Sequence, residues 1–172
     1  MNQPHYLLLP VNPLFIAFSF IVAFALNFLP WGSWFAVPDF VALVLVFWSI
    51  HQPRKVGIGL AFCMGLLMDV HDAIYLGENA LAYTLLSFFA ITIHRRVLWF
   101  RVPAQTFHVF PLFLFVQAVQ VGVRMVVAPD AHFPGWWIFS VSVLTMLLWP
   151  VATVMLLAPQ RRAVNKDETR PI

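Results

Sequence analysis

The feature that most constrains this chain is a series of apolar runs with few or no charged residues. The clearest of them, 136–157, is uncharged from end to end and long enough for a helix that crosses a membrane. The runs are uniformly apolar and lack the alternation that is typical of outer-membrane strands. Because lipid leaves no partner for free backbone polar groups, such runs predict transmembrane helices.

The overall composition leads to the same class of protein. Of the 172 residues, 62% are hydrophobic and only 10% are charged, whereas soluble domains have about 45–50% apolar and about 25% charged residues. A soluble fold of this size could not bury so much apolar surface. We therefore predict an all-α integral membrane protein. The single cysteine, Cys63, excludes an intrachain disulfide.

We expect one membrane domain, 1–159, followed by a polar tail, 160–172. The second apolar run is short, because its 13 residues would give about 20 Å of helix against a hydrocarbon core of about 30 Å. A re-entrant hairpin there would leave Arg54 and Lys55 in lipid, at about 2.5–3.5 kcal/mol each. We therefore interpret it as spanning. The six expected spans are about 13–29, 38–50, 56–69, 79–93, 107–127 and 136–157.

The charged residues sort to opposite sides of this six-span order. Nine of the ten basic residues fall in the turn 51–55, the link 94–106 or the tail, and only Arg124 falls on the other side. Five of the seven acidic residues lie on the side of Arg124. By the positive-inside rule, both termini are expected to be cytoplasmic. This placement of charge indicates topology and contact of the basic loops with anionic headgroups of membrane lipids, and it does not indicate nucleic-acid binding.

Small residues recur at every fourth position in the segment 57–69, GIGLAFCMGLLMD. Gly57, Ala61 and Gly65 would lie near one face of a helix, and Asp69 continues the series. In lipid, such a face allows another helix to approach closely, so we expect it to pack against a helix of this chain or of a partner. Asp69 is expected near the outer interface. We favour a structural role for it, capping a neighbouring helix or bonding across the bundle, over a ligand role.

A second polar series lies on the fifth expected span. Gln117, Gln120 and Arg124 are spaced to share one helix face. Within a membrane, that pattern indicates an inward polar face, which could line a cavity or contact a partner helix. The alternatives are hydrogen bonds between helices for the two glutamines and snorkelling to the interface for Arg124.

The acidic loop 69–78 is the densest cluster of ionisable residues. Asp69, His71 and Asp72 could in principle bind a metal, but their spacing fixes no coordination geometry. For Asp72 and Glu78 we favour a solvated loop on the non-cytoplasmic face. The chain also lacks a Gly-rich phosphate loop, a G-x-S-x-G elbow and an H-E-x-x-H pair. We therefore expect no catalytic residue, no metal and no cofactor.

Four segments, in their order and spacing, carry a resemblance to a known family. They are LNFLPW (26–31), PDFVALVLVFWSIHQPRKVGIG (38–59), FCMGLLMDVHDAIYLGENALAYTLLSFFA (62–90) and LLWPVATVMLL (147–157). On these residues the chain resembles the bacterial rod shape-determining protein MreD family over most of its length. The loop VHDAIYLG (70–77) is more acidic and bulkier than the Gly- and Ser-rich loop common in that family.

The resemblance implies a non-enzymatic component of the bacterial inner membrane that helps the cell-elongation machinery to organise lateral peptidoglycan synthesis. Its implied partners are MreC and, through MreC, the actin-like MreB, the RodA glycosyltransferase and the elongation penicillin-binding protein. The implied fold is similar to the six-helix substrate-binding subunits of energy-coupling-factor transporters. A small-molecule-binding transporter subunit is therefore the alternative function, and a membrane metalloenzyme is a weaker third.

Overall fold

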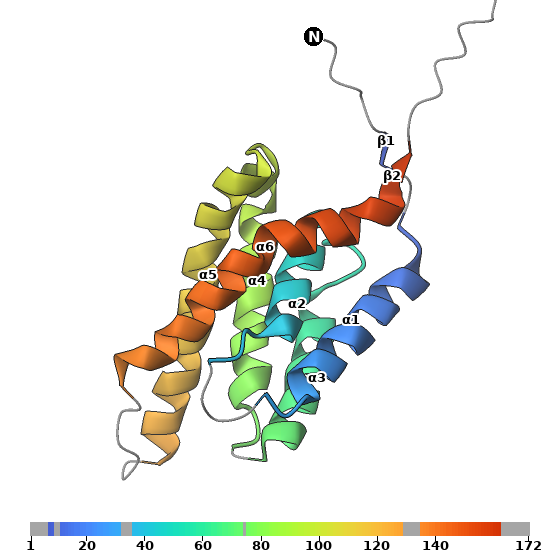
Figure 1. The fold of residues 1–172 in the computed structure, drawn as a ribbon. Helices are drawn as coiled ribbons and strands as arrows, with labels where there is room; N and C mark the ends of the chain where they lie inside the picture. Colours follow the sequence, from blue (N-terminus) through green and yellow to red (C-terminus); the bar gives the residue numbers. More distant parts are fainter. Residues whose placement is uncertain (1–6, 9–10, 32–35, 74, 129–134, 163–172) are drawn as a thin grey trace, which may run out of the picture.

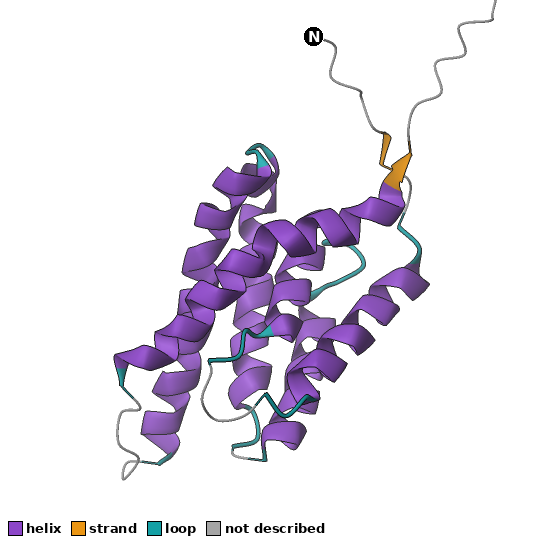
Figure 2. Cartoon of the chain, viewed as in Figure 1, coloured by secondary structure: helices purple, strands orange, loops and turns teal. Residues whose placement is uncertain are grey.

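The computed structural model describes residues 7–8, 11–31, 36–73, 75–128 and 135–162, and this part of the chain is almost entirely helical (Figure 2). Two-residue strands, β1 (Leu7–Leu8) and β2 (Arg161–Arg162), pair antiparallel. Short 3-10 helices, η1 (Trp136–Phe139) and η2 (Ala158–Gln160), flank the last helix. The six α-helices are α1 (Pro13–Phe28), α2 (Phe40–His51), α3 (Ile58–Asp72), α4 (Glu78–Leu98), α5 (Val102–Val127) and α6 (Ser140–Leu157).

The helices form one bundle in which successive helices run in opposite directions (Figure 1). α4 packs against α2, α3 and α5, while α1 packs against α2 and α6 lies across α5 and α2. One end of the bundle carries the N-termini of α2, α4 and α6, and we call it the Asp end after Asp39 and Asp69. The other end carries the turn 51–57 and the short α4–α5 link, and we call it the basic end.

The core of the bundle surrounds α2. Every residue from 41 to 50 is buried, so this helix is enclosed on all sides by its neighbours. Its few polar side chains bond across helices: the Trp48 indole N–H donates to Ser19 Oγ at 2.8 Å, and the hydroxyls of Ser49 and Ser87 lie 3.1 Å apart. A continuous apolar run thus forms a fully buried helix rather than one with a solvent-facing side.

Each of the six segments expected to span the membrane overlaps one of these α-helices. Three helical segments, Glu78–Leu98, Val102–Val127 and Trp136–Gln160, are long and apolar enough to cross a membrane, and Pro13–Phe28 and Phe40–His51 are shorter apolar helices. Within the described residues, these findings establish a helical bundle of a type that fits a membrane protein. That all six helices cross the membrane stays a prediction.

The helix ends differ from the expected spans at the basic end. α4 continues to Leu98, so Arg95 and Arg96 lie in its last turn and not in a long link. α5 begins at Val102, which leaves only 99–101 between the two helices. Basic side chains in a last turn interact favourably with the negative end of the helix dipole, which accounts for the extension of α4 beyond its most apolar part.

Candidate functional site

The polar side chains at the Asp end form two networks of hydrogen bonds. The first joins the end of α3, the start of α4 and the last turns of α5, and we call it the Asp69 network. It consists of Asp69, Asp72, Glu78, Asn79, Gln120 and Arg124, together with backbone amides of α4. The second network surrounds Asp39 and is described after the Asp69 network.

Asp69 caps the N-terminus of α4. It lies in the last turn of α3 and is only 3% exposed. Its Oδ2 accepts from the backbone N–H groups of Gly77 and Ala80 at 2.8 and 3.2 Å, and its Oδ1 accepts from that of Asn79 at 2.7 Å. These amides have no partner within their own helix, and the helix dipole favours a negative charge beside them. These bonds have the geometry of a helix cap, which is the structural role that we favoured for Asp69.

The approach of α3 to α4 is closest at Gly65, one turn before Asp69. A Cβ built on Gly65 would lie 2.4 Å from Ala80 Cα and 2.5 Å from the Asn79 carbonyl oxygen. Ala61 is also fully buried, whereas a Cβ on Gly57 would meet no atom within 4 Å. The small-residue face at Gly65 is therefore occupied by α4 of the same chain, and this contact brings the Asp69 carboxylate within reach of the α4 amides.

Glu78 forms an ion pair with Arg124 and is not part of a solvated loop. The Arg124 Nε donates to Glu78 Oε1 at 2.7 Å, and Glu78 is 2% exposed. The solvated-loop interpretation of Glu78 was therefore wrong. Arg124, which we expected to snorkel to the interface, is 33% exposed and bonds to Glu78. Burying a carboxylate is costly unless it is paired or hydrogen-bonded, and Arg124 of α5 provides the opposite charge for Glu78.

The amide of Asn79 links the remaining members of the Asp69 network. Gln120 Nε2 donates to Asn79 Oδ1 at 2.7 Å, and Asn79 Nδ2 donates to Asp72 Oδ2 at 2.9 Å. Gln117, the third residue of the polar series on α5, is half-buried and lies outside this network. The polar face of α5 thus meets the start of α4 through Gln120 and Arg124.

The second network, which we call the Asp39 network, is centred on the N-cap of α2. Asp39 Oδ1 accepts from the Ala42 backbone N–H at 2.8 Å and from Asn27 Nδ2 at 3.3 Å, and its Oδ2 accepts from the Tyr83 hydroxyl at 2.7 Å. The backbone N–H of Asp39 donates to Thr145 Oγ1 at 3.1 Å. This one residue therefore connects α1, α2, α4 and α6.

Sequence reasoning missed the Asp39 network. The only local signal was a Pro-Asp pair before an apolar run, which is a helix-start pattern and accounts for the N-cap bond to Ala42. Nothing in the sequence indicated Tyr83 or Thr145, because their bonds to Asp39 span 44 and 106 residues.

The carboxylates of the two networks hold helices together. Both oxygens of Asp69 and of Asp39 accept hydrogen bonds, and Glu78 is paired. His71 Nδ1 lies 3.2 Å from Asp72 Oδ1 at an exposed position. Within the described ranges, no three His, Cys, Asp or Glu side chains are grouped as metal ligands would be. The hydrogen bonds of this site connect helices to one another.

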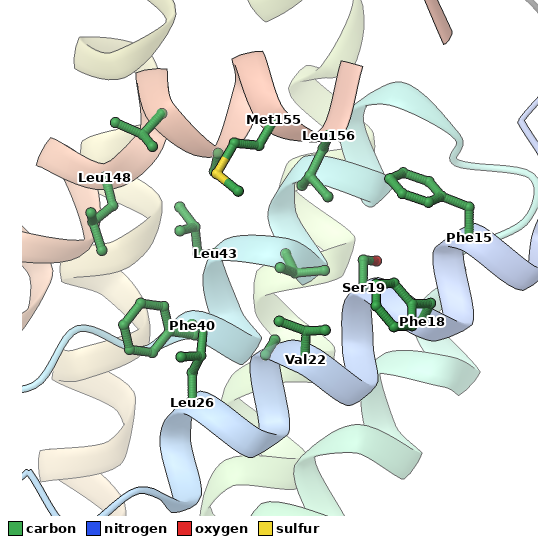
Figure 3. Close-up of a pocket in the computed structure, with 14 residues that line it drawn as sticks. Phe15, Phe18, Ser19, Val22, Leu26, Phe40, Leu43, Leu148, Met155 and Leu156 are labelled. Atoms are coloured by element: carbon green, nitrogen blue, oxygen red, sulfur yellow. The ribbon is translucent and has the colours of Figure 1, made fainter. Parts of the chain in front are cut away.

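Two apolar grooves flank α1. The first lies between α1, α2 and α6 and has a volume of about 290 Å³; its lining side chains, such as Phe18, Leu43 and Met155, are apolar apart from Ser19 (Figure 3). The second lies between α1 and α3, with a volume of about 630 Å³. A third cavity, of about 530 Å³, lies beside α5. None of the three is lined by Gln117, Gln120 or Arg124, so the polar face of α5 opens into none of them.

Comparison with known proteins identifies relatives of the chain. The model of the family described as rod shape-determining protein MreD matches residues 10–159, which include all six α-helices. A rod shape-determining protein MreD from Haemophilus influenzae is 28% identical over 137 residues, covering 76% of this chain and 81% of the relative. No solved structure matches the chain.

Proposed function

Because the chain belongs to the MreD family of rod shape-determining proteins, we propose that it is a non-enzymatic inner-membrane scaffold of the cell-elongation machinery. In this role it helps to organise lateral peptidoglycan synthesis through contacts between helices within the membrane. The match of the family over 10–159 carries this proposal, because it covers the whole helical bundle and not one isolated motif. Family membership supports a part in rod-shape determination, and the finer role is our proposal.

The internal bonding of the bundle supports a scaffold. The carboxylates of Asp69, Asp39 and Glu78 form contacts between helices of the same chain, which favours a structural role for them. Large apolar side chains face outward on several helices, for example Leu14 at 75%, Val70 at 69% and Met155 at 66% exposure. A bundle of this kind offers partners an apolar surface held in a fixed shape, which is what intramembrane contacts require.

The partners that we propose are MreC and, through MreC, MreB, RodA and the elongation penicillin-binding protein. They are implied by the resemblance to the family. The face of Ala61, Gly65 and Asp69 packs against α4 of the same chain, so we assign it to building the scaffold and not to holding a partner. We therefore assign partner contacts to the outward-facing apolar surfaces of the helices.

We also propose that the Asp end is periplasmic and that both termini are cytoplasmic. The basic residues of the turn 51–55 and of the α4–α5 link lie at the basic end, as the positive-inside rule requires of a cytoplasmic end. Arg124 is the one basic residue expected on the opposite side. Its guanidinium is paired with buried Glu78, so it adds no free positive charge there.

The alternative is a small-molecule-binding subunit of a transporter. That function needs a polar cavity between helices, and Gln120 and Arg124 instead bond to Asn79 and Glu78. The proposed likeness to energy-coupling-factor subunits also has no solved structure behind it. A metalloenzyme built on Asp69, His71 and Asp72 is less favoured still, because Asp69 accepts three backbone hydrogen bonds.

Depletion of the protein in its bacterial host tests the proposal. We expect rod-shaped cells to become spherical, and we expect MreC to co-purify with the tagged protein from detergent extracts. Expression of the wild-type chain should restore the rods. Unchanged rod shape together with no recovery of MreC would refute the scaffold, and loss of uptake of a nutrient without a change in shape would favour the transporter subunit.

A further inference from the structure

The groove between α1 and α3 is apolar along its length and positively charged at one end. Its walls come from Pro13, Ile16, Ala17, Phe20, Ile21 and Phe24 of α1 and Leu60, Met64 and Leu67 of α3. Lys55, at the basic end, is the one charged residue that lines it. The groove between α1, α2 and α6 has no charged lining residue at all (Figure 3).

Contacts near its two ends join the sides of this groove. At the Asp end, the rings of Phe28 and His71 stack with centroids 4.0 Å apart. At the basic end, the Lys55 ammonium donates to the Val11 carbonyl oxygen. Between these contacts the two helices are separated by the groove, with a volume of about 630 Å³. That volume lies within the about 300–1,000 Å³ that is usual for small-molecule sites.

No carboxylate of the described residues neutralises the charge at the basic end. An ammonium group has three donors, and the bond to Val11 uses one of them. Among the described residues, no carboxylate lies within ion-pairing distance of Lys55, since their ion pairs involve other residues. Arg54 is its exposed neighbour in the same turn. The mouth of the groove therefore attracts an anion.

The length of the groove matches one leaflet of a bilayer. Its α1 wall runs from Pro13 to Phe24, which is about 17 Å of helix at 1.5 Å per residue. Half of a hydrocarbon core of about 30 Å is about 15 Å. A molecule that has an anionic head at Lys55 and an apolar tail of this length fits both the chemistry and the dimensions.

We propose that this groove binds a phospholipid with an anionic headgroup, from the leaflet at the basic end. One acyl chain lies between α1 and α3, and the headgroup phosphate lies beside Lys55. Because α1 contacts α3 little elsewhere, the bound chain also supports α1 against the rest of the bundle. This site does not depend on the proposed partners.

Native mass spectrometry of the full-length protein in detergent tests the headgroup. The probes are phosphatidylglycerol and phosphatidylethanolamine with identical acyl chains. We expect tighter binding of phosphatidylglycerol, and we expect Lys55→Gln to weaken it about five-fold, equivalent to about 1 kcal/mol for one basic side chain near an anionic surface. Binding of phosphatidylethanolamine should weaken less, because its ammonium group offsets the charge of its phosphate. Arg54→Gln, which removes an equal charge outside the groove, should have a smaller effect.

A bulky side chain within the groove tests the tail. Ala17 is an exposed residue of the groove wall, so Ala17→Trp should reduce the binding of both lipids while the protein still folds. Ala25 is exposed on the same helix but lines neither groove, and Ala25→Trp is the matched control. Circular dichroism of each variant checks that the helices remain.

Three results would overturn the proposal. The first is equal affinity of the wild-type protein for the two lipids. The second is unchanged affinity for phosphatidylglycerol in a folded Lys55→Gln or Ala17→Trp variant. The third comes from a photo-crosslinking amino acid placed at Ala17 in living cells: it should label phospholipid, and a protein adduct would assign the groove to a partner helix.

Discussion

Asp69 and Asp39 both cap a helix at the Asp end, but they use different kinds of donor. Asp69 receives three backbone N–H groups from the start of α4, so both of its oxygens are occupied by amides that cannot rotate. Asp39 receives one backbone N–H, from its own helix, together with the side chains of Asn27 and Tyr83. The first carboxylate joins two consecutive helices, whereas the second gathers side chains from distant parts of the chain.

The difference shows what each network tolerates. A backbone amide at a helix start stays fixed, so an oxygen removed from it leaves a buried donor without a partner. A tyrosine hydroxyl can turn and accept a hydrogen bond as well as donate one. The Asp69 network should therefore depend on both carboxylate oxygens and on the close contact of α3 with α4. The Asp39 network should need only one acceptor oxygen on a side chain of the same shape.

The substitution Gly65→Leu should have the largest effect on the Asp69 network. Its side chain would overlap Ala80 and force α3 away from α4, because even a Cβ would lie 2.4 Å from Ala80 Cα. We expect a loss of more than about 3 kcal/mol in the free energy of unfolding, the upper end of typical overpacking costs. The measurements are SDS titration of the purified protein and rescue of rod shape in depleted cells.

The control for that substitution is Gly59→Leu on the same helix. A Cβ at Gly59 would meet no atom within 4 Å, so this variant should fold and restore rods. Equal tolerance of both substitutions would mean that the close approach at Gly65 does not hold α3 to α4.

The pair Asp69→Asn and Asp39→Asn compares the two caps directly. An Asn side chain keeps one acceptor oxygen. At Asp69 it therefore leaves a buried backbone N–H without a hydrogen-bond partner, at a cost of about 2 kcal/mol. At Asp39, the retained oxygen can still serve Ala42, and the new NH₂ can donate to the Tyr83 hydroxyl. We therefore expect Asp39→Asn to cost less than about 1 kcal/mol, with both variants compared by SDS titration. A reversed order would contradict the assigned donor types.

Removal of the ion pair in the Asp69 network should have a smaller effect than Gly65→Leu or Asp69→Asn. Arg124→Gln leaves the buried Glu78 carboxylate without a partner, but the Arg124 side chain is 33% exposed and water can replace it in part. We expect a loss of about 1 kcal/mol, below the about 3–5 kcal/mol typical of fully buried pairs. Unfolding of the purified variant measures it.

A double variant completes that measurement. Adding Glu78→Gln to Arg124→Gln removes the unpaired charge and should recover most of the stability. If the double variant is instead less stable than Arg124→Gln alone, then the neutral side chain at 78 disturbs the start of α4 more than the stranded charge does.

The parts of the Asp69 network that were predictable are those close together in sequence. Gly65 and Asp69 lie one helical turn apart, and the loop to α4 is short, so a small-residue face followed by a carboxylate indicated a close contact and a cap. The Asp39 network was not predictable in this way, because Thr145 lies 106 residues away on α6. Similarly, the partner of Glu78 lies 46 residues away on α5.

The sequence by itself determined the class of protein, the all-helical fold and the family, because apolar composition, helical period and motif order are properties of the chain alone. The tertiary structure decided which side chains meet. Glu78 became a buried member of an ion pair, and the small-residue face turned to α4, because the rotation of each helix about its axis is set by packing against all its neighbours at once. That rotation also placed Lys55 at the mouth of an open groove.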